Sequence, residues 1–246
     1  MPAIVNDHNV IEFSEVGGTI LSWEHRGIKI LFPQTFVRRG GEMRPRGGMP
    51  VCWPNFGTVD PAFGLPQHGV LRKREADEIA PNGVVFRGTD LLGPMHNVLS
   101  EVRILIEPKQ TGFVYTLAAR LLEPSPKEVF VNAGFHPYFR TPTGDALAGT
   151  WVGGTKLYYQ SQQGPIWEDV DRGLDVHPKG VGTVKMRLGG VWDFAMEKRV
   201  VFWRDSRDYL CAEPILGMPG MYGTPDCPKL TEKGLVMTCA FSVSLD

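Results

Sequence analysis

The chain has 246 residues and a mass of 27.3 kDa, a size that fits one large domain or two small ones. Its 26 Lys and Arg residues nearly balance its 27 Asp and Glu residues, and the net charge of −1 argues against a general binder of nucleic acid or of anionic membranes. The 29 glycines and 20 prolines follow no collagen period, so they indicate many turns between short strands.

The opening residues lack a basic stretch followed by an apolar stretch, so we expect no secretory signal. No window approaches roughly 18 uninterrupted apolar residues, so we expect no transmembrane helix. The cysteines lie far apart without a CxxC pair, which argues against a structural zinc site. Reduced thiols in the cytoplasm are therefore expected for Cys52, Cys211, Cys227 and Cys239.

The first predicted elements are two short strands within residues 17–33, where apolar and polar residues alternate on both sides of a turn at Arg26-Gly27. Residues 38–69 differ, because they contain Gly-Gly and Arg-Gly pairs and five prolines but little periodicity. We interpret this segment as a long ordered loop, and such loops in compact domains are often functional.

Strand candidates then follow one another to the end of the chain. VRILIEP and FVYTLAARLLEP predict a hairpin whose turn is residues 109–112, and residues 236–245 alternate between two faces. No segment carries a helical stripe of about twelve residues. The sequence therefore predicts an all-β fold, with one domain over residues 1–246 built from antiparallel strands in packed sheets. The remaining strand candidates are VVFRGTD, EVFVNAGF, TVKMRLG, RVVFWRD and YLCAEP.

Two of the six histidines lie in segments that are typical of functional sites. His68 ends the long loop in LPQHGVLR, beside Gly69, which permits close backbone approach. His136, in NAGFHPYFR, follows a predicted strand and has aromatic neighbours. The alternative for either histidine is a half-buried side chain hydrogen-bonded to the backbone.

Glu213 is the acid that stands out, because YLCAEPIL is otherwise an apolar strand. A carboxylate there is either paired with a cation or desolvated with a raised pKa, and both situations are common at active sites. Asp193, between Trp192 and Phe194, is a similar candidate. The alternative for Glu213 is an outward-facing strand residue.

Positive charge gathers between Phe36 and Glu75, where seven Lys and Arg residues accompany three acids. Arginine forks are natural ligands for phosphate or carboxylate, so the segment is a candidate site for an anionic group. The alternative is a solvated face whose charges are paired elsewhere. The basic residues are Arg38, Arg39, Arg44, Arg46, Arg72, Lys73 and Arg74.

Several motifs with well-understood chemistry are missing. GxGxxG, GxxxxGK[ST] and GxSxG do not occur, and neither HxH nor HExxH offers a metal-binding pair. Cys52 is a candidate nucleophile, but its apolar neighbours favour an inert buried thiol.

Four blocks occur in the order RGGMPVCWPNFG, LPQHGVLR, NAGFHPYFR and CAEP. Together with the opening GGTILSWEHRGIKILF and the closing LTEKGLVMTCAFSVSL, they resemble the aldose 1-epimerase (mutarotase) superfamily, and in particular its hexose-6-phosphate mutarotase branch. The resemblance implies a galactose-mutarotase-like β-sandwich with a sugar cleft on a concave face. It also implies reversible interconversion of the α and β anomers of an aldose, with a sugar or sugar phosphate as the small-molecule partner and with no metal or organic cofactor.

The same resemblance implies roles for individual residues. His136 would be the general acid, Glu213 the general base, and His68 a residue that orients the substrate and supports protonation of the ring oxygen. Asp193 would hold sugar hydroxyls, while Arg46 and Arg72 lie where the phosphate-using branch carries basic residues. The aromatic side chains expected to stack on the sugar are Trp53, Phe56 and Tyr138.

The chemistry explains why such residues suffice. A base removes the proton from the C1 hydroxyl, an acid protonates the ring oxygen, and the open aldehyde rotates about C1–C2 before it closes again. The acid role leads us to expect a His136 pKa near or above the reference value of about 6.5. Two alternatives remain at this point: a carbohydrate-binding sandwich without catalysis, and a sugar hydrolase or lyase, which would need two carboxylates.

Overall fold

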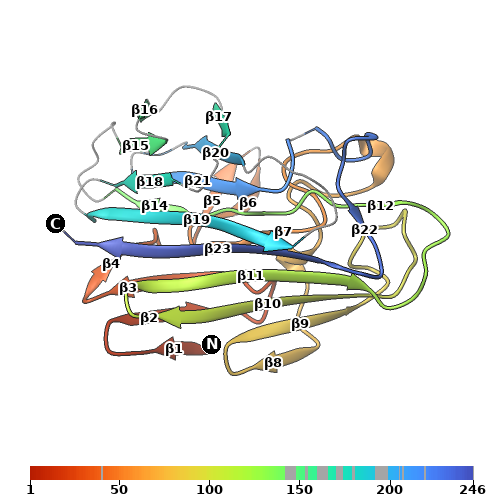
Figure 1. Cartoon of the computed structure of the whole chain (residues 1–246), viewed down its shortest axis with the longest axis horizontal. Helices are drawn as coiled ribbons and strands as arrows, with labels where there is room; N and C mark the ends of the chain where they lie inside the picture. The colour runs from red at the N-terminus through yellow and green to blue at the C-terminus, as the bar shows by residue number, and fades with distance from the viewer. Residues whose placement is uncertain are drawn as a thin grey trace.

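The computed structural model describes most of the chain, and its strands form two large sheets with smaller ones beside them (Figure 1). This all-β architecture confirms the predicted fold class. Paired strands within the sheets run antiparallel, as in the β10–β11 hairpin that was predicted across residues 109–112. The described residues are 1–39, 41–141, 148–152, 155–159, 166–169, 174–178, 181–191, 199–204, 206, 208–218 and 220–245.

The larger sheet has nine strands, in the order β16 (Thr155–Tyr159), β15 (Ala148–Val152), β18 (Leu174–His177), β19 (Thr183–Val191), β23 (Leu235–Ser244), β11 (Gly112–Leu121), β10 (Ser100–Lys109), β9 (Gly83–Gly88) and β8 (Glu78–Ala80). The second sheet runs β17 (Ile166–Asp169), β20 (Arg199–Trp203), β21 (Tyr209–Ile215), β13 (Gly134–Phe135) and β7 (Val51–Cys52), and β14 (Tyr138–Arg140) also pairs with β21.

The smaller elements lie beside these two sheets. A four-stranded sheet contains β1 (Ala3–Val5), β2 (Asn9–Phe13), β3 (Ile20–His25) and β4 (Ile28–Lys29). Two further sheets have two strands each: β5 (Thr35–Arg39) pairs with β6 (Glu42–Arg46), and β12 (Val129–Phe130) pairs with β22 (Lys229–Leu230). Two short 3₁₀ turns are η1 (Pro61–Phe63) and η2 (Leu71–Lys73).

The main hydrophobic core contains residues from both large sheets, and the period of two in their strands explains why. On β23, Met237, Cys239 and Phe241 are buried, whereas the residues between them are half-buried. Across the core, Tyr115 of β11 stacks on Phe135 of β13 at a ring distance of 4.6 Å. The two sheets are therefore joined by packed side chains at the position where β13 leads into His136.

The second sheet is covered on both faces, and alternate residues of β21 belong to different clusters. Leu210 and Ala212 pack in the main core, whereas Cys211 packs with Tyr138 in a separate cluster. Because strand neighbours point to opposite faces, Glu213 shares the face of Cys211. This outer face of the second sheet carries the candidate site.

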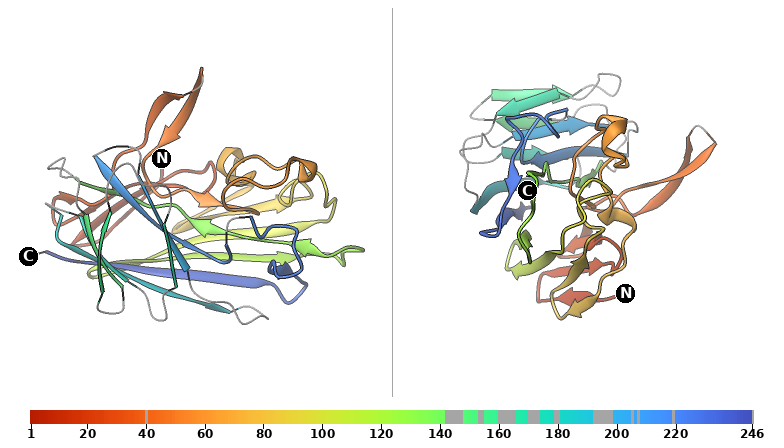
Figure 2. Two further views of the ribbon diagram at one scale, coloured as in Figure 1. Left: turned by 90° about the horizontal axis from the view of Figure 1, so that it is seen from above. Right: turned by 90° about the vertical axis from the view of Figure 1, so that its right-hand side faces the viewer.

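Two parts of the predicted strand pattern were wrong. Residues 38–69 are not loop throughout, since β5 and β6 form a hairpin that projects from the body of the molecule (Figure 2). EVFVNAGF is not one strand, because β12 pairs with β22 whereas β13 pairs with β7 and β21. In the part of the chain that the structure describes, no helix is long and apolar enough to cross a membrane.

Candidate functional site

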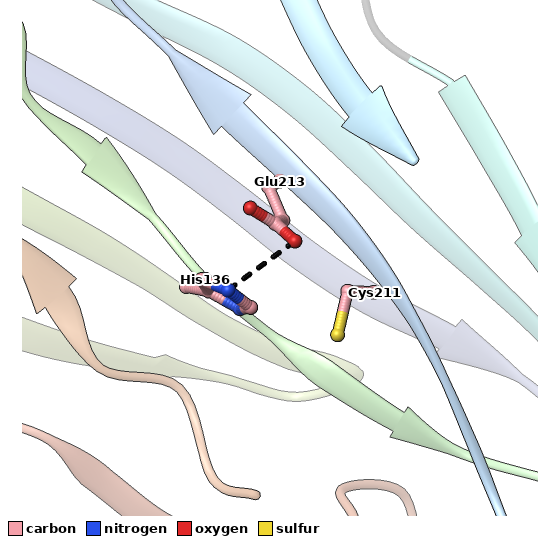
Figure 3. Close-up of side chains that lie close together, drawn as sticks. All are labelled: His136, Cys211 and Glu213. Atoms are coloured by element: carbon pink, nitrogen blue, oxygen red, sulfur yellow. Dashed lines mark ion pairs between the residues drawn. The ribbon is translucent and has the colours of Figure 1, made fainter. Parts of the chain in front are cut away.

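Glu213 and His136 meet on the outer face of the second sheet (Figure 3). The Glu213 side chain projects from β21, and His136 lies between β13 and β14. His136 Nε2 is 3.4 Å from Glu213 Oε1, and the two residues are 4% and 2% exposed. The backbone N–H of His136 donates to Pro50 O at 3.0 Å, which fixes the segment that carries the imidazole.

The His136 ring is held by aromatic neighbours. It stacks on Tyr138 at 4.7 Å with an interplanar angle of 10°, and the edge of Trp203 lies against it with the ring centres 6.0 Å apart. Both contacts restrict rotation of the imidazole, so its Nε2 stays directed at Glu213.

His68 is distant from His136 and Glu213 in the sequence but lies beside His136 in the fold. Its ring lies 5.2 Å from that of His136 in an edge-on arrangement. The backbone of His68 has φ +64°, a left-handed conformation that is uncommon outside glycine. Gly69 follows with φ +77°, and a Cβ there would lie 1.9 Å from Trp53 O, so only glycine fits against the β7 segment. The loop thus accepts local strain in order to bring His68 to the site.

Hydrogen bonds to Nδ1 determine how His68 is protonated. The backbone N–H of Gly57 donates to His68 Nδ1 at 3.2 Å, and Cys52 Sγ lies 3.5 Å from the same atom. A nitrogen that accepts a backbone N–H carries no proton, so the neutral ring holds its proton on Nε2. Burial, with the charges of Arg72 and Arg46, lowers the pKa of His68 to about 3. His68 is therefore a neutral donor through Nε2–H.

Burial also controls the acid and base candidates. It lowers the pKa of His136 well below its usual value, and His68 and Arg72 act in the same direction. It raises the pKa of Glu213 well above its usual value, although the charge of Arg72 opposes this. The expected His136 pKa near or above 6.5 is thus wrong for this structure, because desolvation outweighs the nearby carboxyl group. Both shifts favour the arrangement in which one proton on the pair leaves the two groups uncharged.

The comparisons bear on the fold in which this geometry occurs. No family model matches the chain. A galactose mutarotase-like protein from Lactobacillus casei ATCC 334 superposes with a TM-score of 0.76 at 14% identity, over 99% of this chain and 100% of that one. A galactose mutarotase related enzyme from Lactobacillus acidophilus gives 0.67 at 12% identity over 99% of each chain. A GalM/aldose epimerase homologue from C. elegans gives 0.59 at 11% identity, also over 99% of each. The chain has the galactose mutarotase-like β-sandwich fold.

Within this mutarotase-like fold, the two predicted arginines lie near the pair. The Arg46 guanidinium carbon is 5.4 Å from the centre of the Trp203 ring, which also contacts His136. Arg72, in η2, is close enough to the site for its charge to lower the pKa of both histidines and of Glu213. Both arginines are half-buried at this side of the mutarotase-like sandwich.

The aromatic residues that were predicted to stack on the sugar are buried in the structure. Trp53, the residue after β7, is fully buried in the main core, whereas Cys52 at the end of β7 belongs to a different cluster and its sulfur lies 3.5 Å from His68 Nδ1. We therefore leave Trp53 out of the proposed site. Tyr138 lies at the site but is 1% exposed and stacks on His136, so it positions the imidazole and offers no free ring face. Asp193 lies outside the described residues.

The sequence reasoning missed two residues that the mutarotase-like fold brings to the site. Trp203 of β20 is half-buried and contacts both Arg46 and His136. Cys211 of β21 lies beside Glu213 and is directly opposite Trp203 in the strand register. The signal for Cys211 was present, since it lies two residues before Glu213 in a strand and so shares its face.

Proposed function

We propose that this chain is an aldose 1-epimerase that interconverts the α and β anomers of a sugar by acid–base ring opening and reclosure. The observation that carries the proposal is the contact of 3.4 Å between His136 Nε2 and Glu213 Oε1, with His68 as a third group beside them. O1 and O5 of a cyclic aldose are both bonded to C1, so an acid and a base that serve them must lie a few ångströms apart.

Ring opening requires that one proton leaves O1 and that another is added to O5. The Glu213 carboxylate removes the proton from the C1 hydroxyl while the His136 imidazolium protonates O5, and the C1–O5 bond breaks to give the open aldehyde. After rotation about C1–C2, O5 attacks the other face of the aldehyde. His136 then recovers the O5 proton while Glu213 returns its proton to O1. His68 donates from Nε2–H to a sugar oxygen and orients the substrate.

The proton count of the pair fits this cycle. Ring opening converts a carboxylate and an imidazolium into a carboxyl group and a neutral imidazole, and both arrangements contain one proton. Transfer of that proton between Glu213 and His136 interconverts them, and burial favours the uncharged arrangement before substrate binds. The pair therefore exchanges protons with the sugar in both directions without a net change in its own protonation.

We also propose that the preferred substrate carries an anionic group, as in a hexose 6-phosphate. The support is the pair of half-buried arginines beside the site, Arg46 on the Trp203 ring and Arg72 in η2. A guanidinium offers paired donors that match phosphate oxygens. An anion bound there would hold the sugar by the end remote from C1.

The test of the reaction is anomer exchange, measured by NMR exchange spectroscopy or polarimetry above the uncatalysed rate. The double variant His136→Asn, Glu213→Gln is expected to lose most of the catalysed rate, because each group supplies about 10²–10⁴-fold. Unchanged exchange in the double variant would remove the proposal, even if sugar still bound.

The test of the anionic substrate compares glucose 6-phosphate with glucose. Arg46→Ala is expected to raise KM for the phosphorylated sugar about tenfold or more and to change KM for glucose little. Arg38→Ala is the matched control, since Arg38 lies on the partner strand of the same hairpin and is exposed. Equal effects of Arg46→Ala on the two sugars would contradict a phosphate role.

A further inference from the structure

Three buried side chains of different chemistry converge beside β21 (Figure 3). They are His136, Cys211 and Glu213, and one ligand atom from each lies within 4.8 Å of the other two. Cys211 and Glu213 share one face of β21, and His136 approaches that face from the chain between β13 and β14. The proposed mechanism uses only two of the three and gives the thiol no role.

We propose that these three residues form an inhibitory binding site for a thiophilic divalent cation, with zinc as the natural candidate. A ring nitrogen, a thiolate sulfur and a carboxylate oxygen are the three ligand types that zinc takes in proteins. Magnesium and calcium prefer sets of oxygen ligands, so the imidazole and thiolate select against them.

The geometry suits a tetrahedral ion. Ligand atoms at about 2.0–2.2 Å from a tetrahedral centre lie about 3.3–3.6 Å apart. His136 Nε2 and Glu213 Oε1 are already separated by 3.4 Å. One ligand atom of each residue, the Cys211 sulfur included, lies within 4.8 Å of the other two, so with a Zn–S bond of about 2.3 Å the sulfur needs to move by about an ångström to complete the third ligand position.

The charges also balance in this buried environment. Binding releases two protons to solvent, one from the Cys211 thiol and one from the His136–Glu213 pair, and the resulting thiolate and carboxylate together neutralise the two charges of the cation. A buried charge is tolerated when it is neutralised by its ligands. The fourth ligand position is left for water or for a hydroxyl of the sugar.

Inhibition follows if the proposed function holds, and this part of the inference rests on it. A His136 nitrogen bonded to zinc cannot carry the transferred proton, and a ligated Glu213 oxygen is a weaker base. One ion thereby removes both proton-transfer groups, and chelation restores them.

The experiment uses cobalt(II) as a spectroscopic substitute for zinc on the full chain, after reduction and removal of metal with a chelator. One equivalent is expected to give a thiolate-to-cobalt charge-transfer band with the visible bands of a tetrahedral site, and zinc is expected to displace it. Cys211→Ser is expected to abolish the charge-transfer band and to weaken zinc binding at least about tenfold. Cys227→Ser is the control, because the Cys227 thiol is buried away from the site and donates to Val131 O. This variant should bind cobalt and zinc as the unmodified chain does.

Each outcome decides the matter. Absence of the cobalt bands, or a charge-transfer band that survives Cys211→Ser, would overturn the site. If Cys211→Ser does not fold, His136→Asn provides the second variant, expected to keep the thiolate band and to lose the tetrahedral pattern. Binding is read without any activity, so failure of the proposed epimerase leaves this result intact. Zinc that binds through Cys211 but leaves measured anomer exchange unchanged would overturn the inhibitory role.

Discussion

Two glutamates on opposite sheets have similarly low solvent exposure and different surroundings. Glu101, on β10 of the nine-stranded sheet, is 3% exposed, and Glu213, on β21 of the second sheet, is 2% exposed. Glu101 accepts from three arginines, two of them on neighbouring strands: Arg87 at 2.7 Å, Arg103 at 2.8 Å and Arg120 at 3.0 Å. Glu213 has a histidine at 3.4 Å.

The partners reverse the direction in which burial acts. The hydrogen bond from Arg103, with those from its neighbours, lowers the pKa of Glu101 to about 2 despite desolvation. Burial raises the pKa of Glu213 well above its usual value, and the Arg72 charge only opposes this. Glu101 is thus a structural group that is charged at neutral pH, whereas Glu213 is kept able to hold and release a proton. The comparison shows that a low exposed fraction alone does not determine whether a carboxyl group is a charged structural group or a proton-transfer group.

The largest expected effect separates the two glutamates by activity. Glu213→Gln is expected to reduce kcat/KM for anomer exchange by about 10²–10⁴, because the amide cannot accept the C1 hydroxyl proton. Its free energy of unfolding at neutral pH is expected to rise, because the unfolded chain releases the Glu213 proton above pH 4.5 whereas the folded chain retains it, and an amide carries no such cost.

Glu101→Gln is the matched variant and should show the opposite result. Its free energy of unfolding is expected to fall by about 1–2 kcal/mol, a modest loss because the arginine ends of the pairs are exposed and screened. Its kcat should stay within about twofold of the original. Urea unfolding and NMR exchange on the same preparations measure both quantities. A comparable loss of activity in the two variants would contradict the assignment.

The next effect concerns His68, whose proton sits on Nε2 in the proposed site. The amide nitrogen of Gln reaches the position of Nε2, whereas the end of an Asn side chain reaches only that of Nδ1. His68→Gln should therefore stay within about tenfold of the original rate, and His68→Asn should lose about 10²–10³-fold, as expected for removal of one hydrogen-bond donor to the reacting sugar. Asn at least as active as Gln would argue against donation from Nε2, as would a ring that titrates near 6.5 in nitrogen-15 NMR.

A smaller effect is expected in the pH profile of kcat/KM. The singly protonated pair is the active form, so activity falls at low pH when a second proton binds and at high pH when the last proton leaves. Because burial lowers the pKa of His136 and raises that of Glu213, these limbs move apart and leave a plateau through neutral pH. Glucose is the substrate to use, since phosphate itself titrates near pH 6. An inflection at 6.5 would indicate an ordinary, solvated histidine.

Strand periodicity made much of this fold predictable. The alternation of residues 236–245 appears as β23, and the YLCAEP pattern appears as β21. The resemblance also led us to expect that His68, His136 and Glu213 meet, which the structure bears out as a matter of distance. Their chemical roles remain proposals.

The sequence was less informative where packing decides the outcome. The β5–β6 hairpin was missed because its charged residues, prolines and glycines hide a period of two. Trp53 was assigned to the sugar because β7, which ends at Cys52, is too short to reveal the side to which the next residue points. The His136 pKa was expected to be high because the sequence gives its neighbours but not its burial, and burial decides the direction here. Trp203 joins the site through the register between β20 and β21, which pairs residues distant in sequence.

The smallest effect distinguishes the two glutamates by the sign of a slope. The first measured quantity is the difference in unfolding free energy between the original chain and Glu101→Gln. The depressed pKa of Glu101 adds a stabilising contribution to this difference, which is present above pH 4.5 and is lost as the pH falls toward 2. For Glu213→Gln the raised pKa gives a contribution that is present below pH 4.5 and is lost as the pH rises above it, because the folded chain retains the proton that the unfolded chain releases. Urea unfolding over a series of pH values measures both difference curves, and the curve for Glu213→Gln reports the coupled titration of Glu213 and His136. Slopes of the same sign would mean that the two carboxyl groups do not differ in the way their partners imply.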